Sequence, residues 1–261
     1  MNRIQSYKVI FNITFNQIIR SKKTILMLIV TFLPVFVAIY YRTSANTDMI
    51  MPEQALSQIM IFFLLFLSIL VSLFYGTALM ADEIDNRTIT YIFTRPIRKY
   101  YVVLWKFLSF LLGSFIILIP PMVLTFLLVS TDSRMSFDFG TSLVLFTKQL
   151  GIAILSILAY GAIFTFFGSR LKHPMIIGLL FAFGWEKIIL IIPGIVRKFS
   201  VAHYLLSSFP KDPSIQRAID HISRGADSSF AASISIITLV TVVFLCLSMY
   251  TAYSKEYAFE Q

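Results

Sequence analysis

The chain has 261 residues, of which 57% are hydrophobic and 13% are charged, and its mean hydropathy is +0.81. An ordinary soluble domain carries about 25% charged residues, so this composition excludes a water-soluble protein and indicates a membrane protein. The net charge of +9 does not indicate nucleic-acid binding, because the basic residues flank apolar runs, where anionic lipid favours them.

The first predicted element is an amphipathic helix within residues 1–23. Tyr7, Phe11 and Ile18, with Ile4 before them and Phe15 or Thr14 between them, recur at steps of three and four residues and share one face. This segment is basic and contains no acidic residue. We expect a helix on the cytoplasmic membrane surface, acting either as an elbow that leads into the first span or as a plain interfacial anchor.

Long apolar runs follow, separated by short and mostly basic connections. In hydrocarbon every backbone amide must be satisfied within the protein, so apolar runs of about 20 residues predict spanning helices. The sequence thus predicts an all-α polytopic membrane protein, a single domain over residues 1–261, with six transmembrane helices. The predicted spans are residues 24–41, 56–80, 107–130, 149–169, 175–192 and 228–254.

The placement of lysine and arginine predicts the orientation of these spans. Basic residues are concentrated in residues 1–23, 82–106 and 170–174, which we expect on the cytoplasmic side. Both termini are then cytoplasmic, and residues 193–230 form an outer segment. That segment is itself basic, so a five-crossing alternative remains, in which the fifth run only dips into the bilayer and the C-terminus lies outside.

The fifth run is interrupted by Glu186 and Lys187. Residues 174–185 reach only about 18 Å at 1.5 Å per residue, less than a full crossing of about 30 Å. Because a charge at the centre of a spanning helix costs about 2.5–3.5 kcal/mol, Glu186 should face a cavity or a partner. We expect it either to line or support the outer end of a translocation path, or to cap a re-entrant outer turn where the helix ends. Lys187 points to another face and is expected to extend toward the membrane surface.

The second span repeats small residues at four-residue spacing, Ser68, Ser72 and Gly76, so all three share one helix face. Small residues let another helix backbone approach closely. Packing within the subunit is one explanation of this face. The other is a surface that lines a pore or meets a second copy.

The connector 82–106 is too long and too patterned for a simple turn. Acidic residues close the second span, and Arg95 precedes Pro96, which disfavours helix before the proline and can start a new helix at it. We expect two helical pieces joined at a bend below the membrane, with Lys106 reaching toward lipid phosphates. The connector is either a docking surface for a cytoplasmic protein or a solvated loop without a partner.

The residues of this connector resemble the cytoplasmic signature of type-2 ABC transporter permeases. The likeness rests on an acidic pair and a threonine, then a T-R-P-I step, a basic residue and a lysine at the mouth of the third span. A weaker likeness lies at Trp185 and Glu186, which resemble the W-E pair of that family's fifth span. The matching connector residues are Glu83, Asp85, Thr88, Phe93, Thr94, Arg95, Pro96, Ile97, Lys99 and Lys106.

The resemblance implies a six-span permease subunit that pairs with a second copy or a related permease in a bacterial inner membrane. It implies coupling to separate ATP-binding-cassette ATPase subunits, which bind ATP and Mg, and export of a substrate by alternating access. From the residues themselves, the candidate path residues are Trp185, Glu186, Ser68, Ser72 and Gly76. No cofactor or catalytic residue is expected on this chain, which contains no G-x-x-x-x-G-K-[S/T] loop. The implied coupling residues are Glu83, Asp85, Thr88, Arg95, Pro96, Arg98 and Lys99.

Other classes of function remain possible from the residues alone. A secondary carrier or ion channel would use Glu186 as an ion or proton site in a broken helix. A membrane-embedded hydrolase is the least favoured class, because no span pairs a histidine with an acid or nucleophile at helical spacing. Membrane lipids are expected contacts in every case, and no metal site is predicted, since the three histidines are scattered.

Overall fold

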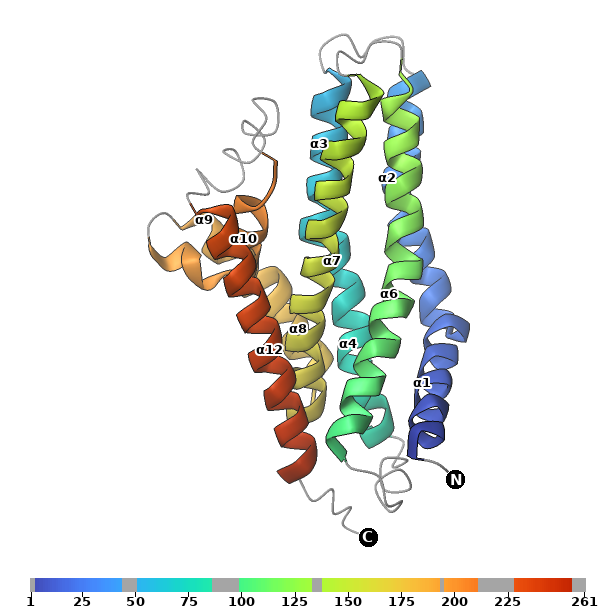
Figure 1. Cartoon of the computed structure of the whole chain (residues 1–261), viewed down its shortest axis with the longest axis vertical. Helices are drawn as coiled ribbons and strands as arrows, with labels where there is room; N and C mark the ends of the chain where they lie inside the picture. The colour runs from blue at the N-terminus through green and yellow to red at the C-terminus, as the bar shows by residue number, and fades with distance from the viewer. Residues whose placement is uncertain are drawn as a thin grey trace.

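The computed structural model describes residues 3–43, 51–85, 99–132, 138–192, 195–210 and 228–254. Within these ranges every regular element is a helix, and no strand occurs. This agrees with the all-α prediction. The described helices form an elongated bundle (Figure 1).

Five helices are long and apolar enough to cross a membrane. They are α2 (Lys22–Thr43), the continuous run 52–84, α6 (Lys99–Ser130), α7 (Phe139–Arg170) and α12 (Phe230–Ser254). The run 52–84 consists of α3 (Pro52–Phe62), the π-helical turn η1 (Phe63–Leu67) and α4 (Ser68–Asp85). Five of the six predicted spans thus correspond to long helices, most of which extend beyond the predicted bounds.

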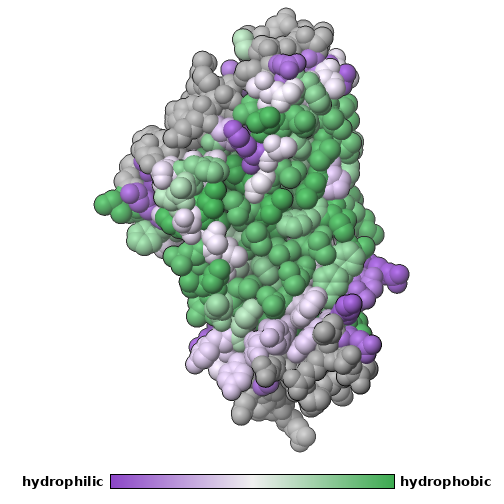
Figure 2. All heavy atoms as spheres, in the orientation of Figure 1, coloured by the Kyte–Doolittle hydropathy of each residue, from purple (hydrophilic) through white to green (hydrophobic). Residues whose placement is uncertain are grey.

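The first four long helices alternate in direction, as Figure 1 shows, whereas α12 runs in the same direction as α7. Helix α1 (Arg3–Arg20) begins at one end of the molecule, and α4, α7 and α12 terminate there. We call this the lower end of the molecule and the opposite one the upper end. Helix α1 rises from the lower end and α2 continues upward, after which α3 and α4 descend, α6 rises and α7 descends. Large apolar side chains cover the outer surface of the bundle between these ends (Figure 2), as expected for a surface in contact with lipid.

The fifth predicted span is not one regular helix. It consists of α8 (Pro174–Leu179), the π-helical turn η2 (Leu180–Trp185) and α9 (Glu186–Ile191), followed by the 3₁₀ turn η3 (Ile195–Phe199) and α10 (Val201–Ser207). In Figure 1 this broken segment leaves the lower end beside α7 and turns back at α9 and α10, below the tops of α3 and α7. The count of six crossings therefore stays a prediction, although α12 ends at the lower end, where α1 begins.

Helix α1 runs alongside the first half of α6. Tyr7 stacks on Trp105 with ring centroids 6.4 Å apart, and Ser109 Oγ donates to the carbonyl of Phe11 at 3.0 Å. Near its end, the Cγ2 atom of Ile18 lies 2.8 Å from where a Cβ on Gly113 would stand. The apolar face predicted for this helix is thus packed on α6, and its role as an elbow stays a prediction.

We predict that positions at the two ends of the bundle label from opposite sides of the membrane. In a Cys246→Ser background, Thr43→Cys and Gly140→Cys should react with an impermeant thiol reagent added outside cells. Lys172→Cys and Ser254→Cys should react only after permeabilisation, because α7 and α12 both end at the lower end. Labelling of position 254 from outside, with position 172 protected, would contradict this arrangement and support five crossings.

Candidate functional site

A cavity of about 390 Å³ lies at the lower end, between α1, α2, α4 and α6. Its wall is unusually polar for the interior of a membrane protein and carries charges of both signs. Polar lining residues are Thr14, Gln17, Ser21, Lys23, Tyr75, Asp82, Glu83 and Lys106. The cavity therefore joins the start of the chain to the two helices that flank residues 86–98.

A buried ion pair forms the inner wall of this cavity. Lys106 of α6 is only 2% exposed and pairs with the carboxylate of Glu83, which is 16% exposed. The same ammonium group donates to the carbonyl of Leu79 at 2.9 Å. Two acceptors on α4 thus hold one cation of α6, and such a charge-assisted contact is stronger than a neutral hydrogen bond.

The prediction that Lys106 reaches toward lipid phosphates is wrong. Helix α6 begins at Lys99, ahead of the predicted span, so Lys106 is already inside the helix. It lies on the same buried stripe as Val103 and Phe110, which packs toward the bundle. The side chain is turned inward, where Glu83 compensates its charge.

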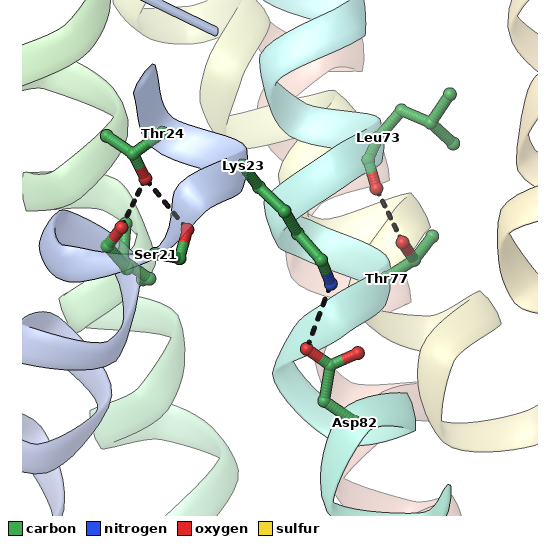
Figure 3. Close-up of polar contacts among 7 residues, drawn as sticks. Ser21, Lys23, Thr24, Leu73, Thr77 and Asp82 are labelled. Atoms are coloured by element: carbon green, nitrogen blue, oxygen red, sulfur yellow. Dashed lines mark hydrogen bonds and ion pairs between the residues drawn. The ribbon is translucent and has the colours of Figure 1, made fainter. Parts of the chain in front are cut away.

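A second ion pair closes the outer side of the cavity and is exposed. Lys23 of α2 donates to Asp82 of α4 at 3.2 Å, and both side chains are more than half exposed (Figure 3). Beside it, Tyr75 donates to Thr24 Oγ1 at 2.8 Å, and Thr24 donates to the carbonyl of Ile18 (Figure 3). These contacts fix the junction of α1 and α2 against α4.

The structure places only part of the predicted coupling segment. Glu83 lies in the cavity, Asp85 is the last residue of α4, and Lys99 is the first residue of α6. The remaining predicted coupling residues, Thr88, Arg95, Pro96 and Arg98, lie outside the described residues. The connector therefore joins two helix ends that the Glu83–Lys106 pair already holds together.

Glu186 is fully buried and binds the beginning of α10. Its carboxylate accepts hydrogen bonds from Ser200 Oγ and from the backbone N–H groups of Val201, at 3.1 Å, and Ala202, at 3.2 Å. The first N–H groups of a helix have no partner within the helix, and a carboxylate there satisfies them. Glu186 thus ties α9 to the start of α10, whereas the predicted helix end at Glu186 is not found, because α9 continues to Ile191.

Lys187, the next residue, contacts the second predicted span. Its ammonium group donates to the carbonyl of Leu65 in η1 at 2.9 Å. A π-helical turn disturbs the regular hydrogen-bond ladder and leaves carbonyls open to other donors. The expectation that Lys187 extends to the membrane surface is therefore wrong: it is bound within the protein, where Phe183 of η2 also packs on Phe66 of η1.

The small residues of the second span lie in the contact between α4 and α7. Ser68 Oγ is 2.7 Å from Ser156 Oγ, and a Cβ on Gly76 would stand 3.0 Å from Cβ of Phe164. Ser72 is also fully buried, and its hydroxyl has no hydrogen-bond partner among the described residues. These contacts agree with the packing interpretation, and a role in a path stays a prediction.

The predicted path residues are only partly brought together. Tyr160, one turn after Ser156 on α7, has its hydroxyl near the Glu186 carboxylate but outside good hydrogen-bonding geometry. A line of polar groups thus runs from the contact between α4 and α7 to Glu186. Trp185, by contrast, is 51% exposed on the outer surface, away from this line.

Sequence reasoning missed Tyr160, Ser200 and the pairing of Lys106. The position of Lys106 on an apolar stripe was a usable signal, because i, i+3 and i+4 residues share a helix face. Ser200 was detectable as a helix N-cap, since its hydroxyl also accepts from the N–H of His203 at 3.4 Å. Nothing in the sequence indicated that Tyr160 would lie near Glu186.

Long apolar helices, buried charges that are internally paired and an apolar outer surface define this chain as an all-α polytopic integral membrane protein. The sequence model of the family described as "ABC-2 family transporter protein" matches residues 15–185, about two thirds of the chain. The chain therefore belongs to the ABC-2 transporter family, as the resemblance in the connector indicated. A comparison with curated proteins found no significant match.

We predict that breaking the buried ion pair destabilises the protein far more than breaking the exposed one. Removing one partner of a buried pair costs about 3–5 kcal/mol, and Lys106→Met should fall near the lower bound, because Glu83 keeps some contact with the cavity. Lys23→Met, in the same cavity, should cost about 0–1 kcal/mol. Thermal unfolding of the purified proteins in detergent measures the loss of stability in both variants.

The double variant Lys106→Met, Glu83→Leu serves as a further control for this pair. Replacing both partners by apolar groups of similar size leaves no uncompensated charge. It should therefore recover most of the stability that Lys106→Met loses. A Lys106→Met protein as stable as Lys23→Met would show that the pair does not hold α4 to α6.

A second prediction concerns the cap formed by Glu186. Glu186→Ala leaves the N–H groups of Val201 and Ala202 unpaired, and each buried unpaired group costs about 1–3 kcal/mol. Hydrogen exchange at these two amides should accelerate about tenfold for each 1.4 kcal/mol lost. Glu186→Gln keeps an acceptor and should change exchange less, and Ile188→Ala, at an exposed neighbouring side chain, is the control. Unchanged exchange in Glu186→Ala would refute the capping role.

Proposed function

We propose that the chain is the membrane-spanning permease subunit of an ATP-driven ABC exporter. The observation that carries this proposal is the ion pair between Glu83 and Lys106, which joins α4 to α6, the two helices that flank residues 86–98. A protein that pushes on this connector would act on α4 and α6 together. Membership of the ABC-2 family supports the same function.

ATP hydrolysis is assigned to a partner chain. The sequence lacks the glycine-rich loop and lysine that cradle nucleotide phosphates, and a transporter of this family works with ATP-binding-cassette subunits in general. ATP and Mg would therefore bind to those ATPase subunits. A second copy of this chain, or a related permease, completes the membrane part in our proposal.

In this proposal the lower end faces the cytoplasm of a bacterial cell and the chain lies in the plasma membrane. The basic residues of residues 1–23 and 170–174 support that orientation. It places the connector where a cytoplasmic ATPase can dock. Arg95, Pro96, Arg98 and Lys99, with Asp85 and Thr88 before them, are the proposed contact residues.

The translocation path is proposed to involve the polar line between α4, α7 and α9. Ser68, Ser72 and Gly76 contribute one side and Glu186 the upper end, whereas Trp185 lies on the outer surface and is left out of this path. The hydroxyls of Ser72 and Tyr160 have no hydrogen-bond partner among the described residues, and a buried polar group without a partner is costly. A conformation that separates α4 from α7 would expose these groups to a polar substrate or to water.

A second candidate function is a secondary carrier, which the full burial of Glu186 favours. A carrier would use this carboxylate to bind a proton or ion. The hydrogen bonds to Ser200, Val201 and Ala202 give Glu186 a structural role without transport. In reconstituted vesicles, transport that follows a proton gradient without ATP, and is abolished by Glu186→Gln, would favour the carrier.

The proposed docking is tested by charge reversal in the connector. We predict that Arg95→Glu or Arg98→Glu leaves membrane insertion intact but lowers recovery of the ATPase subunit at least about tenfold, the loss expected when one charge-assisted contact is removed. Transport per ATP hydrolysed should fall as well. Co-purification and vesicle transport assays measure these two quantities.

Arg42→Glu is the matched control, because Arg42 is an exposed cation at the upper end, where it donates to Thr131 Oγ1 at 2.9 Å. This variant should bind the ATPase subunit normally. Glu83 is left intact in the experiment, since its variants would also break the pair with Lys106. Connector variants that match Arg42→Glu in both assays would overturn the docking proposal.

A further inference from the structure

A second cavity, of about 590 Å³, opens between α7, α10 and α12. It is distinct from the polar cavity at the lower end, since the two share no lining residue. Its wall is mainly apolar, with Ile152 and Leu155 from α7, Phe209 after α10, and Phe230 and Ile234 from α12. One cation, Lys148 of α7, lies at this wall. The volume of the cavity is in the range of pockets that hold small amphipathic molecules.

The position of Lys148 along α7 places it at a membrane boundary. Residues 149–169 carry no charge, and Arg170 ends the helix. At 1.5 Å per residue this uncharged stretch spans about 32 Å, which matches the hydrocarbon thickness of about 30 Å. With Arg170 at the lower boundary, Lys148 lies at the upper one, level with lipid phosphates.

The polar groups of the cavity are matched to a phospholipid headgroup. Lys148 is exposed and makes no ion pair with any described residue, so its ammonium can donate to a phosphate. Ser207 and Ser208 give their hydroxyl hydrogens to the carbonyls of His203 and Tyr204, at 2.8 and 2.9 Å. Only their oxygen lone pairs remain for a ligand, so the cavity also suits a headgroup that donates hydrogen bonds.

The apolar floor has room for an acyl chain. A Cβ added to Gly151 would meet no atom within 4 Å, so the glycine leaves open space in the wall between Lys148 and Leu155. We propose that this cavity is a binding site for one phospholipid of the upper leaflet, with its phosphate on Lys148 and an acyl chain along Gly151 and Leu155. The headgroup is of the phosphatidylglycerol kind, carrying hydroxyl donors beside the phosphate.

The proposal is tested with the purified full chain in detergent, titrated with dioctanoyl phosphatidylglycerol and followed by native mass spectrometry. Lys148→Gln should weaken binding at least about tenfold, the loss expected for one charge-assisted hydrogen bond. Arg42→Gln, which removes an exposed cation outside the cavity, should bind as the unaltered chain does. Equal binding by all three proteins would overturn the proposal.

A filling variant tests the floor independently of charge. Gly151→Leu should block binding while the protein remains folded, because its Cβ meets open space. Gly184→Leu is the matched control, since Gly184 has equally open surroundings but lines a different apolar groove beside Trp185. If Gly151→Leu changes the oligomeric state and leaves lipid binding intact, the cavity is a contact between protein chains and the proposal fails.

Comparing ligands shows whether the cavity recognises a whole phospholipid or only its phosphate or its acyl chains. Dioctanoyl phosphatidylglycerol should bind at least about tenfold more tightly than inorganic phosphate or dioctanoylglycerol, which each lack one half of the recognised chemistry. Dioctanoyl phosphatidylcholine, whose headgroup has no hydrogen-bond donor, should also bind more weakly. Tight binding of inorganic phosphate alone would identify an anion site instead and overturn the assignment to a phospholipid.

Discussion

The absence of water in the bilayer core is the constraint on which this structure depends. A polar group there must find its partner within the protein, because an unsatisfied one costs several kcal/mol. Two buried charged side chains meet this requirement between helices: Lys106 is held by Glu83 and the Leu79 carbonyl, and Glu186 by the start of α10. Lys187 donates to the carbonyl of Leu65. The polar contacts therefore determine which helices are fixed to one another.

These contacts divide the bundle into two connected regions. At the lower end, α1, α2, α4 and α6 meet around a charged cavity. Farther up, the broken segment α8–η2–α9 is attached to η1 through Lys187 and to α10 through Glu186. Since α4 continues directly from η1, movement at the lower end has a mechanical route to the broken helix. This route is consistent with the proposed coupling to an ATPase subunit.

The sequence predicted the helical class and five long helices, because an uncharged run of sufficient length has few alternatives in a membrane. The sequence also predicted a helix that starts at Pro96, and α6 runs from Lys99 through the third span without a break. It also assigned Lys106 and Lys187 to the membrane surface, where lysines usually extend. Both are bound inside because an acceptor on another helix lies within reach, and sequence spacing does not show such tertiary contacts.

The most direct test of the coupling route is whether α4 and α6 keep their separation during ATP turnover. Spin labels at Ala81 and Leu108, in a Cys246→Ser background, would report this distance in a complex reconstituted with the proposed ATPase subunit. We expect the same distance distribution with and without ATP and Mg, and a shifted or broader one in Lys106→Met. If ATP moves the two labels apart in the chain with Glu83 and Lys106 intact, the two helices do not move as a unit.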